Sequence, residues 1–450
     1  MKSAASFSAF RARFPSAPRL LALLERVVGI AGWAAVAGVF LYAGILRADT
    51  PRIPVSDPDT WGYLFPALSW IDGQGFVQLH GRDWLYPAFL AFCLKLGGFP
   101  AIVLLQQILG LAAGVFFVLA ARSWSRLLPV HRGILAAVPL VVSGFLWIFL
   151  CNPQTVLFET QIRPEAIINC AVFVQLFCVL QYVHARWGGA PPSASVVWGA
   201  LAMVFAYTAY LLKPSWALAV PITCLPVAAG AFQGWRFRLS GLYPVALAAV
   251  LMAGFFVLPK KLFFVPDATS RTFLPMVLFA IHADLIQDHL HAPGSPVGED
   301  PAGREFLALF DREMAVARSI DHNYETLGFD PDYLMFKSPI FFKIKEYAGG
   351  TNEAFRTFCL KQYGGAIRAN PAGWVRKVAG QMGHFFGMKE STVYRHRIDW
   401  RKEWRSSTES LPRDLTAKFS GRTAADFERY LEEMAPLAES PAETVGPGLL

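Results

Sequence analysis

Charged residues are scarce in this 450-residue chain, at 16% of the sequence, whereas soluble domains average about 25%. The deficit accompanies an excess of apolar residues, which reach 54%, and a mean hydropathy of +0.38. Apolar runs recur between residues 27 and 258 and then stop. The scarcity of charge therefore excludes an ordinary cytosolic enzyme and predicts a polytopic membrane protein with a long polar tail.

Other absences narrow the function classes further. The six cysteines form no CxxC pair and no zinc spacing, which argues against a disulfide scaffold. There is no Walker motif, no glycine-rich dinucleotide loop and no internal repeat, so soluble nucleotide chemistry and inverted-repeat transport lose support. The net charge of +8 comes from basic residues between apolar runs, where they orient helices and contact anionic headgroups. We therefore expect a lipid bilayer as partner and no nucleic acid.

Eight apolar runs are candidate membrane helices, and one of them is too short to span. A spanning helix needs about 17 to 25 residues, and run 84–96 is ended by Gly97-Gly98-Phe99-Pro100. The seven others are 27–45, 101–120, 134–150, 166–183, 196–212, 216–232 and 242–258. The sequence predicts an all-α polytopic membrane protein with seven transmembrane helices, juxtamembrane helices on the outer face and a mainly helical extracytoplasmic C-terminal region.

Basic residues set the expected orientation. With seven crossings, eleven Lys and Arg residues fall in cytoplasmic segments and six fall outside. Lys260 and Lys261, just after the last helix, add to the outer count and reduce the cytoplasmic excess without reversing it. The positive-inside rule therefore predicts a cytoplasmic N-terminus and an outer C-terminus. The expected parts are a cytoplasmic N-terminus at 1–26, a membrane module at 27–258 and an extracytoplasmic region at 259–450. The module contains a first outer loop at 46–100 and a second at 151–165.

The first outer loop places two carboxylates before a helix, in Ser56-Asp57-Pro58-Asp59-Thr60-Trp61-Gly62-Tyr63. A carboxylate beside an apolar helix at the membrane face is suited to act as a general base. Asp59 also stands where a helix N-cap is expected, so plain capping is an equal alternative. The sequence leaves both interpretations of Asp59 open.

The second outer loop and a later turn bring further charges to the same face. Glu159, Arg163 and Glu165 lie just before an apolar run, and Lys213 occupies a tight turn between two such runs. Interfacial anchoring and snorkelling are the alternatives for these residues. Lys213 would also suit a lipid phosphate, because lysine binds phosphate as a point charge.

A polar cluster in the tail is a candidate metal site, with a solvated helix face as the alternative. Its members are His282, Asp284, Asp288, His289 and His291. Helical stretches are expected at 355–368 and 424–434, and a connector is expected to begin at His291-Ala292-Pro293-Gly294.

Four segments together resemble the GT-C superfamily, the membrane glycosyltransferases that use polyprenyl-phosphate sugars, including protein O-mannosyltransferases and lipid A aminoarabinose transferases. The match covers roughly residues 46–232, and one further motif lies in the tail. The segments are Asp59-Thr60-Trp61-Gly62-Tyr63, Arg82-Asp83-Trp84-Leu85-Tyr86-Pro87, Tyr210-Leu211-Leu212-Lys213-Pro214-Ser215-Trp216, and Arg368-Ala369-Asn370-Pro371.

The resemblance implies that Asp59 is the catalytic base, with Asp57 as an alternative. It also implies that Glu159 or Glu165 supplies an acid from the second outer loop. The implied reaction is an inverting transfer of a sugar from a polyprenyl-phosphate carrier to an acceptor hydroxyl on a lipid, a glycan or a protein. The site and the C-terminus are then extracytoplasmic, and the membrane is expected to be the bacterial inner membrane.

For the donor, the resemblance implies that Lys213 and Arg163 hold the lipid phosphate and that Tyr63, Arg82 and Tyr86 help to bind substrate. No clean Asp-x-Asp follows run 134–150, so no cofactor is assigned and a divalent cation stays an open alternative. A membrane transporter or flippase for a lipid-linked or small substrate is the alternative function. A non-enzymatic assembly protein is a third, but it gives no reason for acids in both outer loops.

Overall fold

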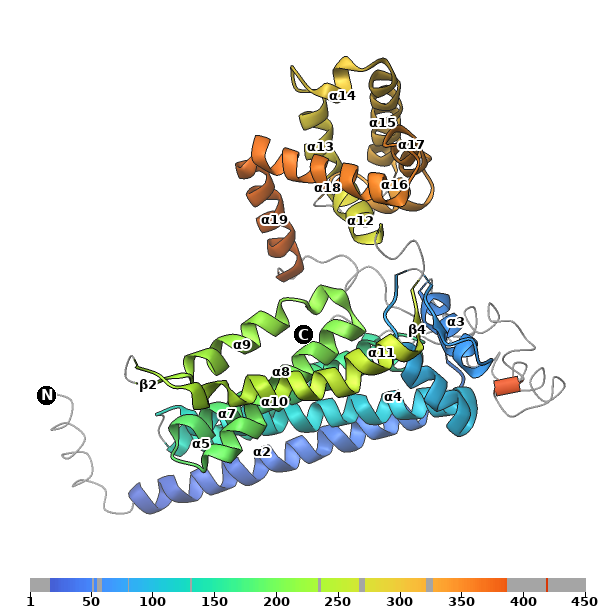
Figure 1. Ribbon diagram of the computed structural model, residues 1–450. Helices are drawn as coiled ribbons and strands as arrows, with labels where there is room; N and C mark the ends of the chain where they lie inside the picture. The colour runs from blue at the N-terminus through green and yellow to red at the C-terminus, as the bar shows by residue number, and fades with distance from the viewer. Residues whose placement is uncertain are drawn as a thin grey trace, which may run out of the picture. The chain divides into compact units, whose positions relative to one another are not determined.

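The computed structural model of the chain describes residues 17–50, 52–54, 59–79, 81–129, 132–233, 236–266, 272–320, 327–386 and 418–419. The chain divides into two compact units (Figure 1). Unit 1 comprises residues 1–77, 83–265 and 398–450, and unit 2 comprises 78–82 and 266–397. Asp57 and the helix expected at 424–434 lie outside the described residues.

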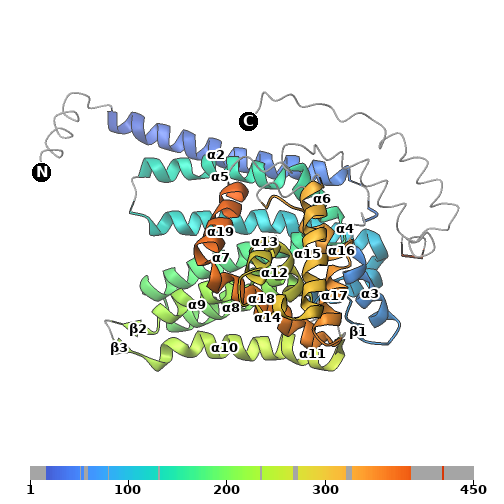
Figure 2. The same ribbon diagram turned by 90° about the horizontal axis from the view of Figure 1, so that it is seen from above.

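Unit 1 is a bundle of long apolar helices that lie side by side in both views (Figures 1 and 2). Within the described residues, six helices are long and apolar enough to cross a membrane. They are α2 (Ala17–Ala48), α4 (Leu85–Leu127), α5 (Arg132–Leu150), α7 (Glu165–Trp187), α8 (Pro192–Leu212) and the continuous segment Leu239–Phe263. This confirms an all-α polytopic membrane protein. The seventh expected span, 216–232, corresponds to a shorter apolar helical segment, Pro214–Ala229.

Shorter elements connect or extend these helices. The segment Leu239–Phe263 contains η2 (Leu239–Leu242), α10 (Tyr243–Met252), the π-helix η3 (Ala253–Val257) and α11 (Leu258–Phe263). The remaining elements are α3 (Thr60–Ile71), β1 (Phe76–Val77), α6 (Pro153–Thr160), η1 (Pro214–Trp216), α9 (Ala219–Ala229), β2 (Phe232–Gln233), β3 (Arg236–Phe237) and β4 (Phe264–Val265).

The break expected after run 84–96 is present inside α4. Gly97 and Gly98 leave helical geometry, and Gly98 adopts φ 70°, ψ −152°, a conformation that L side chains rarely adopt. The backbone carbonyl of Phe419 also lies where a Cβ atom on Gly98 would stand. Two helices therefore meet at this kink, and the part before it is too short to span a membrane.

Polar contacts align the segment 213–230 with α7 along the full length of that helix. Glu165 begins α7 and Arg186 lies in its last turn. The paired residues are, in order along α7, Glu165 with Lys213, Gln175 with Thr223, Tyr182 with Val227, and Arg186 with Gly230. The segment 213–230 thus runs parallel to α7 from one end of the helix to the other.

Two contacts join the loop before α4 to the end of α11. Strands β1 and β4 pair in parallel, with Phe76 opposite Phe264. Asp83 accepts a hydrogen bond from Lys260 Nζ at 2.5 Å. The loop before α4 and the end of the last long helix therefore lie at the same end of the bundle, which we call the α3 end.

All the described secondary-structure elements of unit 2 are helices, joined by turns and loops. A core that includes Phe279, Phe310, Ile340 and Cys359 holds its helices together. These helices are α12 (Phe273–Ile281), α13 (Ala283–Leu290), α14 (Pro296–Glu299), α15 (Pro301–Ser319), α16 (Pro331–Phe336), α17 (Ile340–Tyr347), α18 (Asn352–Ala369) and α19 (Pro371–Phe386). The helix expected at 355–368 is α18, and the expected connector follows α13, which ends at Leu290. The Asn-Pro motif starts α19, where Asn370 Oδ1 accepts from Gly373 N at 2.8 Å.

Candidate functional site

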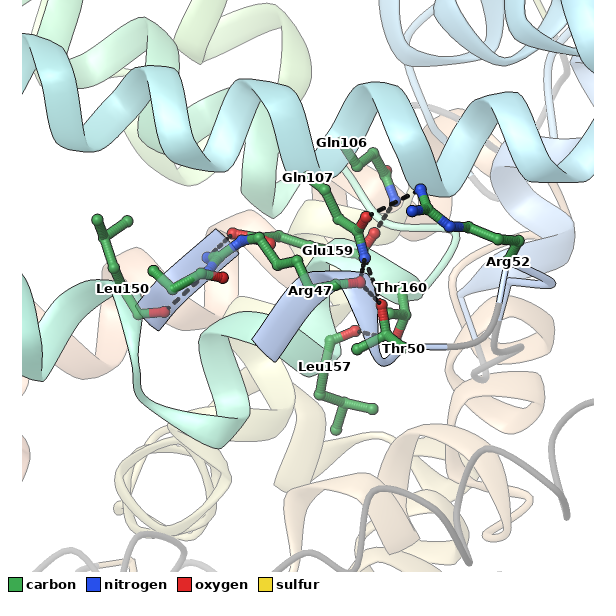
Figure 3. Close-up of polar contacts among 10 residues, drawn as sticks. Arg47, Thr50, Arg52, Gln106, Gln107, Leu150, Leu157, Glu159 and Thr160 are labelled. Carbon is green, nitrogen blue, oxygen red and sulfur yellow. Dashed lines mark hydrogen bonds and ion pairs between the residues drawn. The ribbon is translucent and has the colours of Figure 1, made fainter. Parts of the chain in front are cut away.

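An ion pair is buried at the α3 end of unit 1 (Figure 3). Arg47, in the last turn of α2, donates from Nε to Glu159 Oε2 at 2.6 Å and from Nη2 to Glu159 Oε1 at 2.7 Å. Arg47 Nη1 also donates to the carbonyl oxygens of Ala43 and Leu150. Arg47 is 2% exposed and Glu159 is 1% exposed. The pair thus joins α2, α5 and α6 through groups whose hydrogen bonds are satisfied.

Two neighbouring glutamines of α4 complete the network around this pair (Figure 3). Gln106 Nε2 donates to the carbonyl oxygens of Glu159 and Gln161, and its Oε1 accepts from the Tyr86 hydroxyl at 2.7 Å. Gln107 Nε2 donates to Thr50 Oγ1. Because both glutamines are buried and bonded to loop backbone or side chains, they fix the loops after α2 and α6 against α4.

Gly110 leaves the space that the Glu159 carboxylate fills. A Cβ atom at position 110 would collide with Glu159 Oε1 and Cδ. The carboxylate cannot swing aside cheaply, because Arg47 holds both of its oxygens. Burial raises the pKa of Glu159 to about 7, while the hydrogen bond and charge of Arg47 lower it. The ionised form of Glu159 therefore depends on Arg47.

A second cluster of charges lies at the α3 end and is partly exposed. Glu165 Oε1 accepts from Lys213 Nζ at 2.9 Å and lies 3.1 Å from Arg163 Nη2. The side chains of Lys213, Arg163 and Glu165 are 37%, 25% and 15% exposed. Glu165 Oε2 is buried and has no hydrogen-bond partner among the described residues. The structure therefore brings together three of the expected site residues, with one carboxylate oxygen unsatisfied.

Asp59 is the N-cap residue of α3 and is half-buried. Its carbonyl accepts from Gly62 N, but its side chain makes no capping hydrogen bond to the helix. Plain capping through the carboxylate, the alternative interpretation of Asp59, is therefore absent here. Helix α3 itself is held against α4 by a buried cluster that includes Leu64, Ala67 and Leu90.

The two expected tyrosines belong to that buried cluster. Tyr63 is 4% exposed and Tyr86 is 1% exposed, and their rings meet edge to face at 5.0 Å. The Tyr86 hydroxyl is committed to Gln106. These contacts give both tyrosines a packing role between α3, which contains Tyr63, and α4, which contains Tyr86; a contact with substrate stays a prediction. Arg82, in the short segment of unit 2, is half-buried, and its carbonyl accepts from Gln78 Nε2 at 3.0 Å.

Two members of the tail cluster pair with residues outside it. His291 Nε2 lies 2.8 Å from Asp311 Oδ1, and Asp284 binds Lys377. Burial lowers the pKa of His282 to about 4, and the charge of Lys377 acts in the same direction. In the described part of the chain, no group of three His, Cys, Asp or Glu residues could hold a metal ion. The expectation of a metal site in the tail thus gains no support.

The sequence interpretation did not identify several residues of these networks as parts of a site. The sequence interpretation used Arg47 only as an orientation charge, although the expected topology puts this cation on the side where the positive-inside rule predicts few basic residues. Gln106 and Gln107 were a readable signal, because adjacent amides inside an apolar run are costly unless hydrogen-bonded. Asp83 and Lys260 lie far apart in sequence, and nothing local linked them.

A comparison with protein-family models found no match, and comparisons with curated proteins and with solved structures found none either.

Proposed function

We propose that this chain is an inverting glycosyltransferase that moves a sugar from a polyprenyl-phosphate carrier to an acceptor hydroxyl at the outer face of the membrane. The observation that carries the proposal is the cluster in which Lys213 and Arg163 converge on Glu165. Two cations held close together at one end of a helix bundle suit a phosphate diester at headgroup depth. The resemblance to GT-C enzymes, one of whose motifs contains Lys213, implies the same two cations as ligands of the phosphate.

The proposal includes seven crossings with the N-terminus in the cytoplasm and the tail outside. Segment 213–230 is short, but its contacts with α7 extend from Glu165 to Arg186, which supports a sixth crossing there. The pairing of β1 with β4 supports the same count. An even number of crossings must separate two segments on one face, and α4, α5, α7, α8, segment 213–230 and Leu239–Phe263 make six.

In the proposed reaction, Asp59 removes the proton from the acceptor hydroxyl as that oxygen attacks the anomeric carbon of the donor sugar. The bond between the anomeric carbon and the phosphate oxygen breaks, and the polyprenyl phosphate leaves with an added negative charge. Lys213 and Arg163 stabilise that growing charge. A single displacement inverts the anomeric centre. The place of Asp59 at the start of α3, a helix packed on α4, supports its assignment as the base.

Within the second outer loop, we assign the acid that contacts substrate to Glu165 and a structural role to Glu159. Both oxygens of Glu159 are bonded to Arg47 and the residue is 1% exposed, so a ligand cannot reach them. The Glu165 side chain is 15% exposed and its Oε2 accepts no hydrogen bond from the described residues, so this carboxylate keeps acceptor capacity for a sugar hydroxyl.

We further propose that unit 2 contributes to acceptor binding. It holds a cavity of about 670 Å³ whose lining carries ionisable side chains and an aromatic ring, including Glu305, Arg312, Lys343 and Tyr347. Such a mixture can bond and stack against a polar acceptor. Charge reversal at Lys343 should then change the KM for the acceptor and leave the KM for the donor unchanged.

The proposed site can be tested before the sugar is known, because the leaving group is a polyprenyl phosphate. Purified protein in nanodiscs is titrated with undecaprenyl phosphate, and binding is measured by native mass spectrometry. Lys213→Ala and Arg163→Ala should each weaken binding about tenfold, since hydrogen bonds to charged groups contribute about 1.5–3 kcal/mol. Lys95→Ala removes the same charge from an exposed position on the short helix before the kink and should bind normally.

Equal binding by Lys213→Ala, Arg163→Ala and wild type would remove the phosphate site and with it the proposal. A transporter or flippase would also bind the lipid, so a second assay follows sugar release. Wild-type protein that moves the lipid-linked sugar across the bilayer without breaking its bond to phosphate would replace the glycosyltransferase with that alternative.

A further inference from the structure

A small cavity lies between α2, α4 and α5, away from the α3 end of unit 1. Its volume is about 240 Å³, and its lining combines basic and apolar side chains: Trp33, Val118, Arg122, Ser125, Arg126, Leu135, Val138, Pro139 and Val142. No carboxylate is among these described lining residues. Arg122 and Arg126 lie one helical turn apart near the end of α4, so both guanidinium groups are on one face of that helix.

The cavity owes its shape to close helix packing beside it. Gly32 lies against Pro139, where a Cβ atom would come within 2.8 Å of the backbone of α5. The neighbouring Trp33 is 42% exposed, and the Arg122 guanidinium lies 6.0 Å from the centroid of its ring. The indole thus forms a wall beside a cation, an arrangement typical of the interface between headgroups and acyl chains.

We propose that this cavity binds the headgroup and upper acyl region of an anionic phospholipid. The charges favour a phosphate diester, since the described lining residues include two arginines and no carboxylate. Basic pockets between membrane helices are recurrent sites for anionic lipid headgroups. The apolar floor formed by Val118, Val138 and Val142 argues for a lipid and against free phosphate, because a free phosphate would leave that floor without a partner.

This site is independent of the proposed glycosyl transfer. It uses residues from the other end of α4 and none of the groups assigned to the donor or the acceptor. On the proposed topology it faces the cytoplasmic leaflet, where anionic lipid makes the surface potential negative. A bound lipid would link α2, α4 and α5, so it should also stabilise unit 1.

The test uses the full chain in nanodiscs of phosphatidylcholine with increasing phosphatidylglycerol, and native mass spectrometry measures retained lipid. Arg122→Gln/Arg126→Gln should retain phosphatidylglycerol about 30-fold more weakly, and each single variant about fivefold more weakly, if each arginine contributes about 1 kcal/mol through its hydrogen bond to the bound phosphate. The matched control Arg26→Gln/Arg238→Gln removes two exposed basic residues that do not line the cavity and should bind like wild type.

A second variant separates the cavity from simple charge attraction. Val138→Trp fills the space without changing the net charge, and it should also weaken retention of phosphatidylglycerol. The proposal is overturned if the double arginine variant binds like wild type, if the control loses as much affinity, or if Val138→Trp retains the lipid fully. Displacement of the lipid by an equal concentration of glycerol 3-phosphate would assign the site to a free phosphate instead.

Discussion

The segment between α5 and α7 contains two glutamates, six residues apart, that have opposite surroundings. Glu159 is fully buried, and one arginine satisfies both of its oxygens. Glu165 is partly exposed, shares one oxygen between two cations and leaves the other oxygen unsatisfied among the described residues. The same residue type therefore closes a packed junction in one case and leaves an incomplete polar site in the other.

The difference teaches how to separate structural from functional charge in a membrane protein. A complete set of hydrogen bonds offsets the cost of burying ions but leaves nothing for a ligand. An incomplete set of hydrogen bonds lowers the stability of the protein, and a bound substrate can supply the missing bond. Variants that act on one cluster and spare the other test this distinction.

The largest effect is expected from Arg47→Met, which leaves Glu159 buried without its partner. The free energy of unfolding should fall by about 3–5 kcal/mol, the range for breaking a buried ion pair from one side. Thermal unfolding in detergent, followed by fluorescence-detected size exclusion, measures this loss. Arg52→Met removes an exposed arginine just after the end of α2 and should cost far less. A loss for Arg47→Met as small as that of the control would show that the pair does not stabilise the junction.

The next effect concerns activity. Asp59→Asn retains the size of the side chain but removes its basicity, so transfer of sugar should fall about 10²-fold or more while protein stability is unchanged. Asp72→Asn, at the other end of α3, is the matched control and should retain full turnover. If Asp59→Asn also turns over normally, the base must be another group, and Asp57 becomes the first to examine.

Gly110→Ala tests the buried Arg47–Glu159 pair by packing alone, without changing any charge. The added methyl group would meet the pinned Glu159 carboxylate, so we expect unfolding to become easier by about 1–3 kcal/mol, as for overpacked cores. Gly144→Ala in α5 meets no atom within 4 Å and should stabilise slightly through helix propensity. Both variants are compared in one thermal melt series. Stability equal to wild type for Gly110→Ala would mean that the ion pair can shift at no cost.

The smallest effect is expected from Glu165→Gln. Removing this charge frees Lys213 and Arg163 for phosphate, so undecaprenyl phosphate should bind about fivefold more tightly, since partly exposed ion pairs contribute about 0–1 kcal/mol. The unfolding temperature should stay within the range of wild type, in contrast to Glu159→Gln. Weaker lipid binding would show that Glu165 positions the two cations and does not compete with phosphate for them.

Much of the architecture could be predicted from local pattern. Apolar runs located the long helices, and Gly97-Gly98 located the break in α4, because a spanning helix needs an unbroken apolar length and Gly98 adopts a positive φ. The grouping of Arg163, Glu165 and Lys213 was also anticipated in part, since all three stand at ends of apolar runs. The crossing expected at 216–232 was harder to predict, because the helical segment Pro214–Ala229 is shorter than the length that identifies a membrane span by itself.

The sequence by itself determined that this is a membrane protein, where its helices lie and which charges stand at their ends, because these properties follow from the period and polarity of neighbouring residues. Only the tertiary structure decided that Glu159 belongs to Arg47, 112 residues away, and that Glu165 belongs to Arg163 and Lys213. Pairing between distant charges depends on how helices pack and on small details such as the missing Cβ of Gly110. No local pattern in the chain records that packing.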